Sequence, residues 1–133
     1  MKGQDSGERA ALALLPNVTL LDIPKEVKFS FALTQEEFQA EADRSLRLLE
    51  EAAALARQPS WGLLVLDEVC TSVEAGLFPL QAVLDCFDVP AEVVLTGHQP
   101  HQALLDRADY ITRMEKLRHP YDRGISARRG VEF

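Results

Sequence analysis

The chain has 133 residues, the length of one ordinary domain, and 47% of them are hydrophobic and 26% charged, as in folded proteins. Its formal net charge of −7 argues against general nucleic-acid binding. No apolar run approaches the roughly 18 residues that a membrane span needs. Cys70 and Cys86 form no CxxC motif, so neither a disulfide framework nor a zinc site is expected. We therefore expect a single soluble domain over residues 1–133, cytoplasmic, with no nucleic-acid or membrane partner.

Four short stretches rich in β-branched and apolar residues predict strands, over residues 17–23, 63–66, 92–96 and 109–114. The stretch LLVL at 63–66 is apolar without alternation, as expected of a parallel strand that is covered on both faces. A loop is predicted between Glu68 and Pro79. Two short helices are predicted between the later strands, from Pro79 through Cys86 and over residues 99–108, each with a proline in its first turn.

A longer helix is predicted over residues 35–57, between the first two strands. In LTQEEF, Thr34 can cap the helix while the side chain of Glu37 reaches back, which is the capping-box pattern. Leu33 and Phe38 occupy the two positions of a hydrophobic staple. Apolar residues then recur at helical spacing, so one face of this helix is expected to pack on a sheet.

The alternation of strands and helices predicts βαβ units and an α/β fold, with a parallel sheet flanked by helices. In such sheets, ligands bind outside the carboxyl ends of the strands. Those ends carry Asp67 and Glu68, Thr96 and Gly97, and the stretch that follows Met114. We expect a binding site at this edge.

The stretch LLVLDE has the form of a Walker B segment, in which a hydrophobic strand presents carboxylates to Mg²⁺. The alternative is an acidic residue that only caps a neighbouring helix. None of the seven glycines begins or completes a GxxxxGK[ST] phosphate cradle. Cys70 could be reactive, although a buried structural thiol is the better interpretation.

Two further features leave alternatives open. Phe29 and Phe31 share one side of an extended segment and could pack on a flat ligand, although packing in the core is the commoner use. The three histidines lack a metal-ligand spacing. Seven of the 14 basic residues lie within positions 107–133, where they could meet a phosphate or form a solvated surface.

The end of the chain, RHPYDRGISARRGVEF, is similar to the pattern KHPxxxGIxAxxGIEF of the P-loop type ATP:corrinoid adenosyltransferases, also called cob(I)alamin adenosyltransferases. The matching positions are His119, Pro120, Gly124, Ile125, Ala127, Gly130, Glu132 and Phe133. Four other stretches resemble the same family: VLDEV, LTG against its TGR, RADYITRM against ADxVTEM, and MKGQDSGE against QFxKGxxxSGE. FSF followed by TQEE resembles the aromatic FTWETQ region, with Phe31 in place of a tryptophan.

The resemblance implies a P-loop NTPase-like fold of the RecA type and a reaction in which cobalt(I) of a corrinoid attacks the 5′ carbon of ATP. It assigns Mg²⁺ to Asp67 and Glu68, and the lower face of the corrinoid to Phe29 and Phe31. It also assigns substrate binding to Thr96, Gly97, His98, His119 and Arg128. The implied partners are ATP, cob(I)alamin or another corrinoid, an electron-donating reductase and a second subunit of a homodimer.

Two departures from the family pattern bear on function. His98 replaces the arginine of TGR, so an imidazole stands in place of a permanently charged guanidinium. The chain also begins where the family's second strand ends, so we expect the first strand, the P-loop and the next helix to be absent and the chain alone to be an incomplete enzyme. Two other interpretations stay open: a corrinoid-binding protein without ATP chemistry, and a fragment that does not fold alone.

Overall fold

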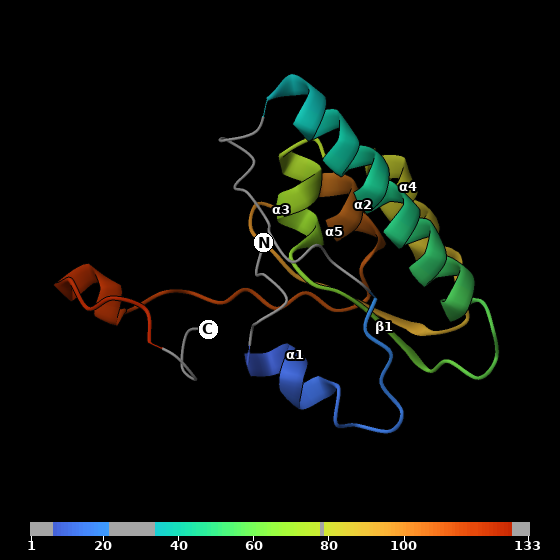
Figure 1. Ribbon diagram of the computed structural model, residues 1–133, viewed down its shortest axis with the longest axis horizontal. Helices are drawn as coiled ribbons and strands as arrows, with labels where there is room; N and C mark the ends of the chain where they lie inside the picture. Colours follow the sequence, from blue (N-terminus) through green and yellow to red (C-terminus); the bar gives the residue numbers. More distant parts are fainter. Residues whose placement is uncertain (1–6, 22–33, 78, 129–133) are drawn as a thin grey trace. The chain divides into compact units, whose positions relative to one another are not determined.

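The computed structural model describes residues 7–21, 34–77 and 79–128 of the chain (Figure 1). It divides into two compact units, one formed by Lys28–Asp109 and the other by Met1–Val27 together with Tyr110–Phe133. No helix in the described parts is long and apolar enough to cross a membrane.

The longest element of the first unit is helix α2, Gln35–Ala56. Its start follows the predicted capping box, because the Thr34 hydroxyl accepts the Glu37 N–H at 3.2 Å and the Glu37 carboxylate accepts the Thr34 N–H at 2.9 Å. Both bonds satisfy backbone donors that a helix start leaves without partners. The expected staple includes Leu33, which lies outside the described residues. The buried face carries Ser45, Leu49, Ala52, Ala53 and Ala56.

Two of the predicted strands form a parallel pair. Strand β1, Leu63–Leu66, pairs with β2, Glu92–Leu95, in a register that places Leu64 opposite Val93 and Leu66 opposite Leu95. The connection between them contains α3 (Val69–Glu74), α4 (Leu80–Leu84) and the 3₁₀ turn η2 (Asp85–Asp88). The pair is therefore a βαβ crossover, and the α/β class with a small parallel sheet is confirmed.

The boundaries of three connecting elements differ from the prediction. Helix α3 was expected to be a loop, and the helix expected from Pro79 through Cys86 is α4 followed by η2, with Pro79 at the N-cap. The helix expected over 99–108 is α5, Gln102–Arg107. It begins after His101, whose Nδ1 accepts the Ala103 N–H at 3.2 Å, so Pro100 precedes the cap instead of occupying the first turn.

One hydrophobic core joins these helices to a single face of the strand pair. Its buried members are Leu49, Ala53, Val69, Cys70, Val83, Cys86 and Leu104, and Leu64, Leu66 and Leu95 pack against them. The other face is open, since Leu63 and Val65 remain 55% and 54% exposed and Val94 is 42% exposed. The expectation that LLVL is covered on both faces is therefore wrong for the described residues. Among them, the helices cover only one face of the strand.

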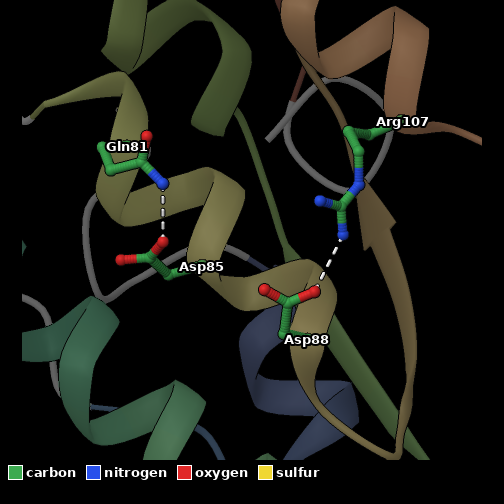
Figure 2. Close-up of polar contacts among 4 residues, drawn as sticks. All are labelled: Gln81, Asp85, Asp88 and Arg107. Atoms are coloured by element: carbon green, nitrogen blue, oxygen red, sulfur yellow. Dashed lines mark hydrogen bonds and ion pairs between the residues drawn. The ribbon is translucent and has the colours of Figure 1, made fainter.

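The close-up in Figure 2 shows two polar contacts among side chains of α4, η2 and α5. Arg107 at the end of α5 donates to Asp88 of η2 at 2.9 Å, and its guanidinium lies 5.4 Å from the centre of the Phe87 ring. Within α4 and the following turn, Gln81 donates to Asp85 at 2.7 Å. The Arg107 contact fixes α5 against η2 at a solvent-exposed position, where such pairs add at most about 1 kcal/mol.

The second unit contains the short helix α1, Gly7–Leu12, and the 3₁₀ turn η3, Pro120–Arg123. Arg9 donates to the carbonyl oxygen of Leu21 at 3.0 Å. Lys116 donates to Asp122 at 2.8 Å, and this hydrogen bond lowers the pKa of the Asp122 carboxyl below its ordinary value. None of the residues described in this unit is buried.

The strands predicted over residues 17–23 and 109–114 do not form where the structure describes them. Val18 instead closes a turn by donating to the Leu15 carbonyl at 3.3 Å, and residues 22 and 23 lie outside the described part. Residues 109–114 adopt no regular structure, with Tyr110 and Met114 95% and 94% exposed. A strand needs a neighbour to bond its backbone, and neither stretch pairs with another described segment.

Candidate functional site

The carboxyl ends of β1 and β2 meet at one edge of the strand pair, and Thr96 joins them. Its hydroxyl donates to Oδ1 of Asp67 at 2.7 Å and accepts the N–H of Glu68 at 2.9 Å. Its carbonyl oxygen accepts the Cys70 N–H at 3.1 Å. The parallel register thus brings together groups that lie 28 or 29 residues apart in the sequence. The sequence analysis expected these residues to meet at this edge.

Glu68 holds an unusual backbone conformation at this edge. Its φ of 58° and ψ of 18° place it in the left-handed region, which disfavours residues that carry a β-carbon. Such a conformation costs on the order of 1 to 2 kcal/mol and persists where surrounding contacts fix it. Here the bond to Thr96 and the start of α3 fix it, and the carboxylate is directed toward the Thr71 hydroxyl, which donates to Oε2 at 2.7 Å.

The turn after β2 passes close to the start of α3. Gly97 has a φ of 134°, and a β-carbon at this position would lie 2.9 Å from both the backbone nitrogen and Oγ1 of Thr71. Only glycine fits such an approach without a shift of the backbone. The next residue, His98, donates its backbone N–H to the Thr71 hydroxyl at 2.9 Å, and its side chain is exposed.

The donor set at this edge suits a hard cation. Asp67 and Glu68 each have one carboxylate oxygen bonded to a threonine hydroxyl, and their other oxygens receive no hydrogen bond from the described residues. Mg²⁺ prefers oxygen ligands and is commonly held by one or two carboxylates, with waters and substrate phosphates completing its shell. No cluster of three or more acidic, histidine or cysteine side chains occurs within residues 7–21, 34–77 and 79–128. The two carboxylates therefore fit a divalent cation such as Mg²⁺ whose remaining ligands are water or substrate oxygens.

Cys70, next to these carboxylates, is held as a neutral thiol. Burial raises the pKa of Cys70, and the negative charge of Glu68 raises it further. The side chain is 6% exposed and belongs to the core cluster. A raised pKa and poor access both oppose nucleophilic chemistry, so the structure supports the interpretation of Cys70 as a structural thiol.

The other four predicted site residues are not among the described residues of the first unit. Phe29 and Phe31 lie outside the described residues. His119 and Arg128 belong to the second unit, where Nδ1 of His119 accepts the Tyr121 N–H at 3.1 Å and so caps η3. Gly124 closes the same turn with a φ of 74°. The structure thus accounts for the histidine and first glycine of the tail motif as turn-forming residues.

Thr71 is the residue at this edge that the sequence analysis missed. Its hydroxyl contacts Glu68, and its position three residues after Glu68 puts both on one side of the helical turn. That spacing could have revealed the contact, but only if a helix had been predicted after Glu68. The stretch VCTSV contains β-branched residues with weak helix propensity, so no local signal in the sequence indicates a helix there.

Comparisons with known proteins agree with the motifs. The family model described as ATP:corrinoid adenosyltransferase BtuR/CobO/CobP matches residues 1–133. The corrinoid adenosyltransferase of Pseudomonas aeruginosa is 32% identical in an alignment 118 residues long, which covers 83% of this chain and 58% of that protein. The corrinoid adenosyltransferase CobA of Salmonella typhimurium is 27% identical over 98 residues, covering 71% and 50% respectively.

A third relative, a corrinoid adenosyltransferase from a Sinorhizobium species, is 33% identical in an alignment 88 residues long, which covers 63% of this chain and 41% of that protein. The chain thus spans about half the length of the curated relatives that it matches. Since the family model covers the chain from its first residue to its last, the chain belongs to the ATP:corrinoid adenosyltransferase family.

Proposed function

We propose that the protein takes part in the transfer of the 5′-deoxyadenosyl group from ATP to cobalt(I) of a corrinoid. The cobalt electron pair forms the cobalt–carbon bond with C5′, while the bond from C5′ to the triphosphate oxygen breaks and triphosphate leaves with that bond's electrons. The product is an adenosylated corrinoid, as needed in its synthesis or salvage. Family membership and the names of the relatives support this reaction.

The strand-end carboxylates would hold Mg²⁺ against the triphosphate, with Glu68 as the direct ligand and Asp67 beside it. When bound, Mg²⁺ supplies positive charge that offsets the charge developing on the leaving triphosphate. The chain's own contribution is to hold the carboxylates: Thr96 fixes Asp67, and Thr71 fixes Glu68. Fixed ligands need no rearrangement when the charge develops.

Other residues are proposed to contact the substrates by their match to family motifs. Thr96, Gly97 and His98 would line the nucleotide at the end of β2, with His98 in the place of an arginine. His119 and Arg128 would contact a substrate from the tail. Phe29 and Phe31 would present an apolar lower face to the corrinoid, which disfavours axial coordination of cobalt and makes its reduction easier.

Assembly and electron supply are further parts of the proposal. A separate reductase would deliver the electron that generates cobalt(I), and two copies of the chain would form a homodimer. The strand pair would belong to a P-loop NTPase-like sheet of the RecA type. The observation that carries the proposed function is the Asp67–Thr96–Glu68 network at the strand ends, which joins the DE and LTG motifs of the family.

The test is an anaerobic assay with cob(I)alamin and magnesium ATP, run in parallel on this chain and on a version extended at its N-terminus, since the chain spans about half the length of its relatives. Adenosylcobalamin is followed by its visible spectrum, and triphosphate is measured beside it. We expect one triphosphate for each adenosylcobalamin. Glu68→Gln should lower the rate by about tenfold or more, since it removes a metal-binding charge. Gln81→Ala is the control, because Gln81 of α4 only bonds Asp85 of η2 (Figure 2), and the substitution should leave the transfer unchanged.

Binding measurements separate this function from its alternative. A protein that binds neither ATP nor a corrinoid would contradict the proposal. A chain that shifts the visible spectrum of a corrinoid but gives no response to magnesium ATP would instead be a corrinoid-binding protein without ATP chemistry.

A further inference from the structure

Thr71 connects the two loops that form the strand-end site. It lies in the first turn of α3, and its hydroxyl offers one proton and two acceptor positions. The proton is donated to Oε2 of Glu68 at 2.7 Å, and the oxygen accepts the backbone N–H of His98 at 2.9 Å. One hydroxyl group thus bonds the residue after β1 and the turn after β2 at the same time.

The position of this hydroxyl is itself fixed. Thr71 is β-branched, which restricts its first side-chain torsion within a helix. Its backbone nitrogen lies so close to Gly97 that a β-carbon on that glycine would be 2.9 Å away from it. The neighbouring N–H of Cys70 is bonded to the Thr96 carbonyl. These contacts hold the start of α3 against the end of β2, so the hydroxyl of Thr71 has a defined place from which to direct Glu68.

The Glu68 carboxylate depends on this contact for its orientation. A glutamate side chain has three rotatable torsions, and Glu68 is only partly buried, so packing does not fix it. Thr71 is the group that donates a hydrogen bond to this carboxylate within the described residues. Its bond to Oε2 leaves Oε1 for another ligand, and groups of this kind around a metal ligand commonly tune affinity by 10 to 100-fold.

We propose that Thr71 is a positioning residue, which orients the Glu68 carboxylate for a divalent cation and couples that ligand to the Gly97–His98 turn. The inference rests on the proposed function, because it takes Glu68 as the metal ligand. A merely structural role, in which the hydroxyl only stabilises α3, predicts a change in stability without a specific change in cation binding.

The experiment measures Mn²⁺ binding to the full chain, using the electron paramagnetic resonance signal of free Mn²⁺ as the probe. Thr71→Val keeps the branched shape without the hydroxyl, and Thr71→Ala removes the hydroxyl without placing a methyl group against His98. Both should weaken Mn²⁺ binding by roughly tenfold. Thr71→Ser keeps the hydroxyl, so its Mn²⁺ affinity should stay within about twofold of that of the unsubstituted chain.

A second measurement, made without any metal, follows the hydrogen bond that the His98 N–H donates to the Thr71 hydroxyl. Hydrogen exchange of the His98 amide should be faster in Thr71→Val and Thr71→Ala than in Thr71→Ser, because only serine can replace the acceptor. Thermal melts monitored by circular dichroism establish that each variant is folded when Mn²⁺ binding is measured.

The outcomes that would overturn the proposal are distinct. If Glu68→Gln abolishes Mn²⁺ binding but both Thr71→Val and Thr71→Ala bind as the unsubstituted chain does, Thr71 has no positioning role and the metal site stands. If the unsubstituted chain shows no saturable Mn²⁺ binding, the carboxylate pair is not a metal site, and the metal part of the proposed function is overturned together with the role of Thr71.

Discussion

At the residue scale, Gly97 is the position where the site tolerates least change. Its φ of 134° is strained for any residue with a β-carbon, and that carbon would also meet the backbone nitrogen of Thr71 at 2.9 Å. We expect Gly97→Ala to lower the free energy of unfolding by about 2–3 kcal/mol, since it combines an unfavourable torsion with a contact that only a backbone shift can relieve. Chemical denaturation measures this change.

Two other glycines separate the causes of that loss. Gly76 has a φ of 72° with nothing near its missing β-carbon, so Gly76→Ala should reveal the torsional cost alone, about 1 kcal/mol. Gly62 has neither constraint, and Gly62→Ala should be close to neutral. If Gly97→Ala were no more destabilising than Gly76→Ala, the close approach to Thr71 would not hold in solution.

At the scale of elements, the capping box of α2 is the clearest case of a local signal that fixes a boundary. Thr34→Ala removes the oxygen that accepts the Glu37 N–H, and we expect a loss of about 1 kcal/mol in the free energy of unfolding. Thr34→Ser retains the acceptor and should be within a few tenths of a kcal/mol of the unsubstituted chain. Equal melting of Thr34→Ala and Thr34→Ser would show that the cap contributes nothing.

The elements that the sequence predicts well are those whose causes are local. Thr34 and Glu37 lie three residues apart, so their pattern is visible in the sequence, and the apolar runs of β1 and β2 are equally clear. The two predicted strands that do not form in the described residues, within 17–21 and over 109–114, have suitable residues, but their formation depends on a neighbouring strand. Whether such a neighbour exists is a long-range property that composition does not reveal.

Helix α3 shows the opposite error. Val69, Thr71 and Val73 have weak helix propensity, yet the segment is helical because Val69 and Cys70 are buried in the core and the Cys70 N–H bonds the Thr96 carbonyl. The same tertiary contact creates the site geometry. The sequence therefore indicated Asp67, Glu68, Thr96 and Gly97 correctly as neighbours at the sheet edge, but it could not reveal Thr71.

At the scale of the whole molecule, burial is concentrated in one of the two units. Among the described residues, all the buried hydrophobic ones lie in Lys28–Asp109, whereas no described residue of the other unit is buried. Since most stabilisation comes from apolar burial, we expect cooperative unfolding to report on the first unit. Leu49→Ala, which removes buried atoms of α2, should lower the free energy of unfolding by about 2–4 kcal/mol.

The matched substitution in the second unit is Leu14→Ala, because Leu14 is 84% exposed and Leu49 only 6%. We expect it to change the free energy of unfolding by less than about 0.5 kcal/mol, since exposed side chains lose little when they are shortened. Denaturation followed by far-ultraviolet circular dichroism compares the two variants under the same conditions. A loss for Leu14→Ala as large as that for Leu49→Ala would mean that the second unit buries this side chain in solution, and stability could then not be assigned to the core of α2–α5 alone.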